Sequence, residues 1–356
     1  MAHRKALFAF GAARGMNTYL YAPKDDPYHR DRWMSPYPAK RWQALEQLIR
    51  AAAEHNIDFV YGFHPGKGLC FSADPPITAL LAKATRFYGA GVRTFAVLFD
   101  DIPSRLQRPV DRKIFGGSLA RAEAEWLARV IAAQPGAWHD VEWWLCPSYY
   151  STDPVLARVF GEFEEGFLET LGTYLPAAVN CLWTGPAVVP KSITLAHLQT
   201  IVGRIHRQLI VWDNYPVNDL AMADELHIGP LQGRDPRLSR LAYGYLNNPL
   251  LQEELSFLPL ATCFDYAAAP STYEHERSWR AAVQERFGAA ALPHWRAIRE
   301  FCEAQLRSKH TGRPLRASPR QVGRWRAVLS YARSQSKQQW TREFKPWFEL
   351  IRDALR

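Results

Sequence analysis

Short apolar runs alternate with longer amphipathic stretches along most of this chain. The short runs are rich in β-branched and aromatic residues and are apolar on both sides, as expected of strands whose two faces are buried. Seven runs are predicted to be strands: Asn17–Tyr21, Asp58–Phe63, Thr94–Phe99, Val141–Cys146, Ala178–Trp183, Leu209–Trp212 and Leu241–Leu246.

The stretches between these runs repeat their apolar residues at helical spacing. Six helices are predicted there: Lys40–His55, Pro76–Tyr88, Ser118–Ala133, Asp153–Leu171, Leu195–Arg207 and Pro249–Thr262. Strands that alternate with helices are typical of βα units around a parallel sheet. We therefore predict an α/β fold, a (β/α)8 TIM-type barrel, of which seven strands are visible in this chain.

A closed barrel of this type has eight strands, so one strand is unaccounted for. The segment Lys5–Ala13, before the first visible strand, has a helical pattern, and in such a barrel a helix follows a strand. The missing strand is therefore expected to be the first one. After about Ser271 the pattern becomes wholly helical, which predicts an N-terminally truncated barrel at residues 1–271 and a helical appendage at residues 272–356.

The composition indicates a globular protein, with 47% hydrophobic and 22% charged residues. The formal net charge is +9, and the late part of the chain contains much of the excess: Lys309, Arg313, Arg316, Arg320, Arg324, Arg326, Arg333 and Lys337. Because nucleic-acid binding needs basic residues clustered on one face, no nucleic-acid partner is expected. Binding of an anionic polymer by the basic tail is left open.

The five cysteines are far apart and include no C-x-x-C pair, so the sequence predicts neither a zinc site nor a disulfide framework. No apolar run approaches the roughly 20 residues of a membrane span. We expect a soluble, cytoplasmic protein without a metal, a cofactor or a membrane partner. A secretion signal lost with an upstream segment would overturn that location.

Two adjacent carboxylates, Asp100 and Asp101, end the third apolar run. In a βα barrel the catalytic groups project from the carboxyl ends of the strands. Two neighbouring acids repel each other, so one tends to keep its proton, as a general acid must, while the other stays ionised. The alternative is that one of the two only caps the following loop.

Other strand ends also carry polar or aromatic residues that could act with these acids. They are Lys24, Tyr150, Trp212, Asn214, Asp219 and Asn248. Singly, Lys24 could be a surface cation, Trp212 a core aromatic and Asn248 a turn residue before proline. Because the carboxyl ends of barrel strands converge on one pocket, their joint occurrence favours a binding site.

The same stretches resemble the N-acetylglucosaminidases of glycoside hydrolase family 84, which include the O-GlcNAcases and bacterial hyaluronidase-like relatives. The resemblance covers about residues 17–266 in order. It rests on NTYLYAPKDDPYHR with Trp33, the PG of FHPGKGLCFS, FAVLFDDIP, LCPSYY, LWTGPAVV, LIVWDNYPVND, IGPLQGR, and LNNP followed by LATCFDY. Jointly these motifs are specific.

This resemblance implies a role for each candidate residue. Asp100 would orient and polarise the 2-acetamido group of the substrate, and Asp101 would be the general acid/base. Hydrogen bonds to the sugar hydroxyls would come from Lys24, Asn214, Asp219 and Asn248, with Asp219 on the 4- and 6-hydroxyl side. Tyr150 and Trp212 would line the acetamido pocket.

The resemblance implies a retaining hydrolase of terminal β-linked N-acetylglucosamine in a glycoconjugate or glycoprotein. The acetamido oxygen itself attacks the anomeric carbon and forms an oxazoline, so no protein nucleophile, metal or cofactor is needed. Asp100 would stabilise the developing positive charge, while Asp101 would protonate the leaving oxygen and then activate water.

The chain departs from the family at its start, because the first barrel strand and its Gly-Phe-Tyr-Gly-like motif are absent. Either the true protein is longer or this is a shortened homologue. A shortened barrel has two open edges, which a homodimer could cover. The alternative function is therefore a catalytically weak or silent sugar-binding homologue, although a lectin has no use for an acid/base pair.

Overall fold

A computed structural model describes residues 2–66 and 68–356 of this chain. It contains two compact units. The first comprises the chain up to Asp213 together with Gly233–Leu246, and the second comprises Asn214–Gln232 and Asn247–Arg356. The predicted domain boundary at residue 271 stays a prediction. The two compact units are defined by internal packing, which does not test whether residues 1–271 and 272–356 fold independently.

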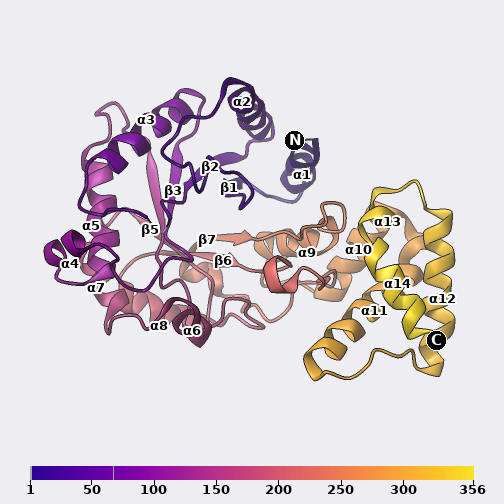
Figure 1. Ribbon diagram of the computed structural model, residues 1–356. Coiled ribbons are helices and arrows are strands. Elements are labelled where there is room, and N and C mark those ends of the chain that lie inside the picture. The colour runs from indigo at the N-terminus through magenta and orange to yellow at the C-terminus, as the bar shows by residue number, and fades with distance from the viewer. Residues whose placement is uncertain (1, 67) are drawn as a thin grey trace. The chain divides into compact units, whose positions relative to one another are not determined.

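The first unit is built on a sheet of seven strands that lie side by side in chain order (Figure 1). Strands β1 to β6 pair in parallel, and β7 is hydrogen-bonded to β6. The strands are β1 (Thr18–Tyr21), β2 (Asp58–Phe63), β3 (Thr94–Leu98), β4 (Glu142–Cys146), β5 (Asn180–Trp183), β6 (Leu209–Asp213) and β7 (Ala242–Asn247). All seven predicted strands are thereby confirmed.

The sheet curves into a half-barrel. Glu142, at the start of β4, accepts hydrogen bonds from Asn180 of β5 at 2.7 Å and from Tyr243 of β7 at 3.2 Å. Strands three places apart in a flat sheet would be separated by roughly 14 Å, at about 4.8 Å per strand. The side chain of Glu142 can reach β7 only because the strands wrap around a common interior.

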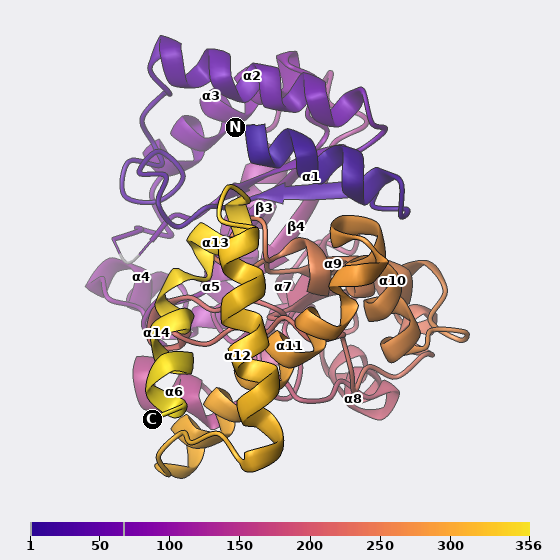
Figure 2. The same ribbon diagram turned by 90° about the vertical axis from the view of Figure 1, so that its right-hand side faces the viewer.

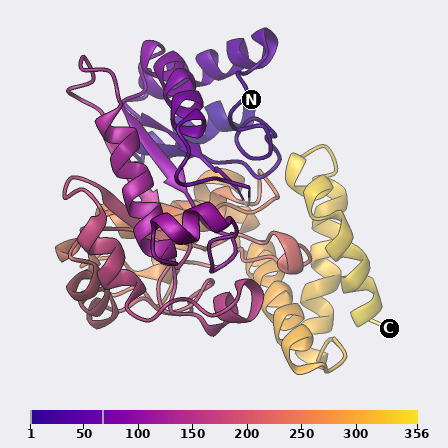
Figure 3. The ribbon, with the colours of Figure 1, turned by 60° about the vertical axis from the view of Figure 1, so that its left-hand side comes forward.

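Helices cover the outer face of this sheet (Figures 1 and 3). Helix contacts follow the order of the strands: α1 packs on α2, α3 on α5, α5 on α7, and α7 on α8. The helices of this unit are α1 (Ala2–Ala12), α2 (Ala39–Ala53), α3 (Pro75–Gly89), α4 (Pro109–Ile114), α5 (Leu119–Ala132), α6 (Pro154–Phe160), α7 (Phe167–Tyr174), α8 (Leu195–Ile205) and the 3-10 turn η2 (Leu238–Arg240). The expected helix before the first visible strand is α1.

Two predicted helices differ from the structure, and one helix of the structure was not predicted. The single helix predicted from Asp153 to Leu171 is two helices, because Gly161 and Gly166 have positive φ angles of 95° and 68° and interrupt it. The predicted helix from Pro249 to Thr262 is replaced by α9, which begins later, at Phe257. Helix α4 was not predicted, because its six residues are too few to show a period.

The second unit is helical, as the pattern after residue 271 predicts (Figure 2). Its core contains five almost fully buried tryptophans, of which Trp295 and Trp340 pack with ring centroids 5.0 Å apart. Its elements are η1 (Leu220–Met222), α9 (Phe257–Ala268), α10 (His275–Phe287), η3 (Ala289–Ala291), α11 (Leu292–Thr311), α12 (Pro319–Ser334), α13 (Gln339–Glu343) and α14 (Lys345–Ala354). Across the described residues, no helix has the length and apolar character to cross a bilayer.

Candidate active site

The predicted pair of acids lies just after the carboxyl end of β3, a strand of the half-barrel. Alternate residues of a strand point to opposite faces, and Ala96 and Leu98 of β3 belong to the apolar cluster inside the sheet. Val97 and Phe99 belong to the cluster beneath the outer helices. Asp100 follows Leu98 at the same two-residue spacing, so it lies on the interior side at the carboxyl end of β3.

Asp100 lies in a largely dehydrated position. Its side chain is 21% exposed, and its Oδ1 atom is buried without a hydrogen-bond partner among the described residues. Burial raises the pKa of Asp100, and the neighbouring Asp101 raises it further, whereas His64, Arg30 and Lys24 act in the opposite direction. A buried acceptor with a free lone pair is suited to an N–H donor from a ligand.

Asp101 has a different environment. Its φ angle of 61° lies in the left-handed region, which aspartate tolerates better than most residues, so the chain turns sharply directly after Asp100. Tyr150 donates its hydroxyl to Asp101 Oδ1 at 3.2 Å. Burial raises the pKa of Tyr150 well above its ordinary value, so the phenol remains a donor. Two adjacent carboxyls are thus held in unlike surroundings.

Two further predicted residues lie in this first unit with the acids. Lys24 is exposed on the loop after β1 and lowers the pKa of Asp100 through its charge. Trp212 lies on β6 two residues after Ile210, and both pack into the interior cluster that contains Tyr150. The structure therefore places Tyr150 and Trp212 against one interior surface, and Lys24 acts on Asp100 through its charge.

The other three predicted residues belong to the second unit. Asn248 donates its amide to Asn214 Oδ1 at 2.7 Å, so these two side chains are in direct contact. Asp219 precedes the 3-10 turn η1, and its carbonyl accepts the backbone N–H of Met222 at 3.0 Å. Asn218, which lies between Asn214 and Asp219 in the chain, is fully buried. It holds the loop after β7 by accepting the N–H of Leu251.

A buried ion pair fixes the end of β6. Asp213, which is fully buried, accepts two hydrogen bonds of 2.7 Å from the guanidinium of Arg234 and one from the hydroxyl of Tyr245. Gly233 precedes Arg234 with a φ angle of 75°, and a Cβ there would lie 2.3 Å from the carbonyl oxygen of Lys191. Only glycine lets this turn approach closely enough to deliver the arginine.

Arg234→Met is therefore expected to lower the free energy of unfolding by about 3 to 5 kcal/mol, because it leaves the Asp213 charge buried and unpaired. Denaturant unfolding followed by circular dichroism measures this loss. Arg237→Met is the matched control: Arg237 pairs with Asp235 at the surface and is 55% exposed, so the loss should stay below about 1 kcal/mol. Equal losses in the two variants would contradict the role given to the buried pair.

A second buried carboxyl lies beneath the site. Glu123 of α5 is fully buried, and both its oxygens accept from the backbone N–H of Ser148, at 3.2 and 3.3 Å, two residues before Tyr150. Burial raises the pKa of Glu123 to about 8. The folded protein therefore keeps a proton on Glu123 that the unfolded chain, with an ordinary carboxyl pKa, loses at much lower pH.

A raised pKa in the folded state means that stability is lost as the pH rises from the unfolded value toward about 8. Glu123→Gln mimics the neutral carboxyl and removes this loss. The variant should gain stability relative to the wild type between pH 5 and pH 9, by up to about 5 kcal/mol. Denaturant unfolding at a series of pH values measures the difference, and a pH-independent difference would contradict a neutral buried Glu123.

Sequence reasoning did not identify His64 and Arg30 as site residues, although His64 precedes the Pro-Gly motif. The loop that carries Arg30 is held by Asp26, which accepts the hydroxyls of Tyr21 and Tyr37 at 2.8 and 2.7 Å. No metal site accompanies them: within residues 2–66 and 68–356, no group of three or more His, Cys, Asp or Glu side chains could hold an ion.

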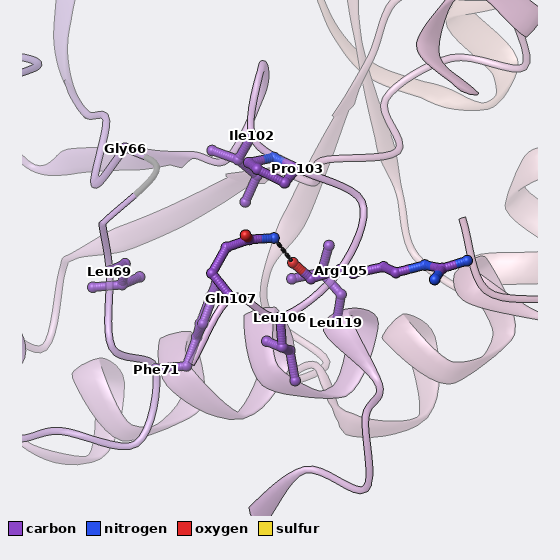
Figure 4. Close-up of a pocket in the computed structure, with 9 residues that line it drawn as sticks. All are labelled: Gly66, Leu69, Phe71, Ile102, Pro103, Arg105, Leu106, Gln107 and Leu119. Atoms are coloured by element: carbon purple, nitrogen blue, oxygen red, sulfur yellow. Dashed lines mark hydrogen bonds between the residues drawn. The ribbon is translucent and has the colours of Figure 1, made fainter. Parts of the chain in front are cut away.

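A small, partly open pocket lies beside the loop that follows the acids (Figure 4). The amide of Gln107 donates to the carbonyl of Arg105 at 2.6 Å and closes this loop on itself. The lining is mainly apolar: Gly66, Leu69, Phe71, Ile102, Pro103, Arg105, Leu106, Gln107 and Leu119. Neither Asp100 nor Asp101 lines this pocket, so it is separate from the predicted sugar site.

The chain matches a protein family described as beta-N-acetylglucosaminidase over residues 1–302. Protein O-GlcNAcase of Mus musculus is 34% identical over 263 residues, which are 74% of this chain and 28% of that relative. The same identity and coverage hold for protein O-GlcNAcase of Rattus norvegicus. This chain thus spans 28% of the length of these curated relatives.

Two solved structures are similar over 99% of this chain. A mutant O-GlcNAc hydrolase from Thermobaculum terrenum superimposes with a TM-score of 0.84 at 30% identity, and 78% of that chain is covered. CpGH84B superimposes with a TM-score of 0.77 at 23% identity, with 64% of that chain covered, and this likeness concerns the fold.

Proposed function

This chain belongs to the beta-N-acetylglucosaminidase family, and on that premise we propose that it hydrolyses terminal β-linked N-acetylglucosamine from glycoconjugates. Glycosylated protein is one proposed substrate, in line with the O-GlcNAcase names of its relatives. The observation that carries the proposal is the pair Asp100 and Asp101, two adjacent acids with unlike environments at the end of β3.

In the proposed reaction, Asp100 accepts the acetamido N–H of the substrate on its unpartnered Oδ1 atom. This contact orients the acetamido oxygen toward the anomeric carbon, and the carboxylate charge stabilises the positive charge that develops as the oxazoline forms. An ionised Asp100 is required for that stabilisation.

Asp101 gives its proton to the leaving oxygen and afterwards takes one from the attacking water. In the unliganded protein burial favours the proton on Asp100. An acetamido N–H donated to Asp100 favours its ionised form. Substrate binding itself thus favours the charge on Asp100 that the reaction needs.

The remaining predicted residues would bind the sugar ring and its substituents. Tyr150 and Trp212, which pack into one interior cluster, would enclose the acetamido methyl group. Hydrogen bonds to the sugar hydroxyls are assigned to Lys24, Asn214, Asp219 and Asn248, with Asp219 on the 4- and 6-hydroxyl side. Asn214 and Asn248 already contact each other and would act together.

The experiment compares an aryl N-acetyl-β-glucosaminide with the matching aryl β-glucoside, which lacks the acetamido group. The proposal predicts hydrolysis of the first and none of the second. Hydrolysis of both would contradict the participation of the acetamido group. Binding of N-acetylglucosamine without hydrolysis would instead favour the alternative, a catalytically silent sugar-binding homologue.

A further inference from the structure

We propose that His64, assisted by Arg30, is a positioning residue for the reaction proposed above: it anchors the main chain of Asp100 and, when protonated, adds positive charge beside its carboxyl. This proposal rests on the proposed function, because it assigns His64 to the same acid pair. It concerns the first unit alone, to which all three residues belong.

His64 is held directly against Asp100. It follows the last residue of β2, its side chain is 6% exposed, and its Nε2 atom lies 3.0 Å from the carbonyl oxygen of Asp100. A carbonyl can only accept, so Nε2 carries a proton and donates it. The same nitrogen lies 3.9 Å from Asp100 Oδ2, within reach of a strong charge interaction.

Arg30 lies beside this contact. Its Nη2 atom is 3.4 Å from His64 Nε2, a distance between two N–H groups rather than a hydrogen bond when Nε2 donates to the Asp100 carbonyl, and both side chains lower the pKa of Asp100. Two hydrogen bonds join their segments: His29 Nδ1 donates to the carbonyl of Gly62 at 2.9 Å, and the N–H of His64 donates to the carbonyl of His29 at 3.3 Å. These two bonds position both side chains relative to each other.

Close packing of the strands makes this arrangement possible. A Cβ at Gly62 would lie 2.9 Å from the Leu98 side chain and 3.3 Å from the carbonyl oxygen of Tyr21. Glycine at this position lets β2 approach β1 and β3, and the strand register pairs Phe63, the last residue of β2, with Val97 of β3. His64 then reaches the Asp100 carbonyl immediately before the sharp turn at Asp101.

Positive charge beside Asp100 favours the ionised form that the proposed reaction requires. Burial and Asp101 both favour a neutral Asp100, whereas an ionised Asp100 is needed against the developing oxazoline charge. The groups that act on Asp100 are His64, Asp101, Arg30 and Lys24, and Tyr150 and Cys146 also lie close enough to interact with its charge. Burial keeps Tyr150 and Cys146 neutral, so among these groups His64, Arg30 and Lys24 act against the effect of burial on the pKa of Asp100.

The test is the pH profile of kcat/KM for an activated aryl N-acetyl-β-glucosaminide in the wild type and in His64→Gln. Glutamine keeps an N–H donor and removes the ring charge. We expect the acidic limb to move to higher pH by about one unit, with about a tenfold loss at low pH and little change above neutrality. His139→Gln, at an exposed histidine, is the matched control and should leave the limb in place.

If His64 only fills space, His64→Gln will scale kcat/KM equally at every pH or leave it unchanged, and either result overturns the proposal. Should His64→Gln fail to fold by circular dichroism, Arg30→Gln tests the same point and must move the limb in the same direction. A wild type without any turnover would sink the proposed function instead, so the two failures are distinguishable.

Discussion

Asp101→Asn is expected to lower kcat/KM about a thousandfold for N-acetyl-β-glucosaminides with alkyl or sugar leaving groups. A poor leaving group must be protonated as its bond to the anomeric carbon breaks, and asparagine has no proton to give. A nitrophenyl leaving group departs as a stable phenolate, so its hydrolysis should suffer much less. Initial rates across a series of leaving groups measure the contrast.

The geometry underlies this contrast. Asp101 is only partly buried and is held by the hydroxyl of Tyr150 at 3.2 Å, so it is placed to exchange protons with a leaving group and then with water. Asp31→Asn, at an exposed acid on the loop after β1, is the matched control and should change neither rate. A loss that is the same for every leaving group would show that Asp101 is not the general acid.

Asp100→Asn should lower kcat/KM for good and poor leaving groups alike, by about a hundredfold to a thousandfold. Every leaving group departs as the acetamido oxygen bonds to the anomeric carbon and closes the oxazoline, and a neutral amide cannot stabilise the positive charge that develops in this step. Asparagine also presents an N–H where the substrate needs an acceptor. Rates measured on the same series of leaving groups test this expectation.

The two variants therefore have different signatures, although the residues are neighbours in the chain. The buried, unpartnered Oδ1 atom of Asp100 is the structural reason for assigning it to the acetamido group. A loss in Asp100→Asn that was confined to poor leaving groups would exchange the two roles. Rates near those of the wild type in both variants would remove the acid pair from the mechanism.

The strands could be predicted from the sequence because both faces of this sheet are buried. Residues such as Val60 and Ala96 face the interior while Tyr61 and Val97 face the helices, and all four are fully buried. Each strand is therefore a continuous apolar run, and polar residues mark its end. The acids Asp100 and Asp101 were found by that contrast.

The rest of the fold and of the site could not be predicted, because it depends on contacts that leave no periodic pattern in the sequence. Gly161 ends a helix because its φ angle is 95°, which a pattern of apolar residues does not reveal. Glu123 lies in an Ala-Glu-Ala-Glu stretch typical of an exposed helix face, yet it is fully buried beneath Ser148. His64 contacts the carbonyl of Asp100, two residues past the end of β3, and only the register of β2 and β3 brings the two together.

The most direct test of the central claim is the rate of hydrolysis of aryl β-glucosaminides whose N-acetyl methyl group carries none, one, two or three fluorines. Fluorine withdraws electrons from the acetamido oxygen and weakens it as a nucleophile while leaving the aryl group unchanged. If the acetamido group attacks the anomeric carbon with the help of Asp100, kcat/KM must fall steeply with each fluorine. A rate that does not depend on fluorination would contradict substrate-assisted catalysis in this protein.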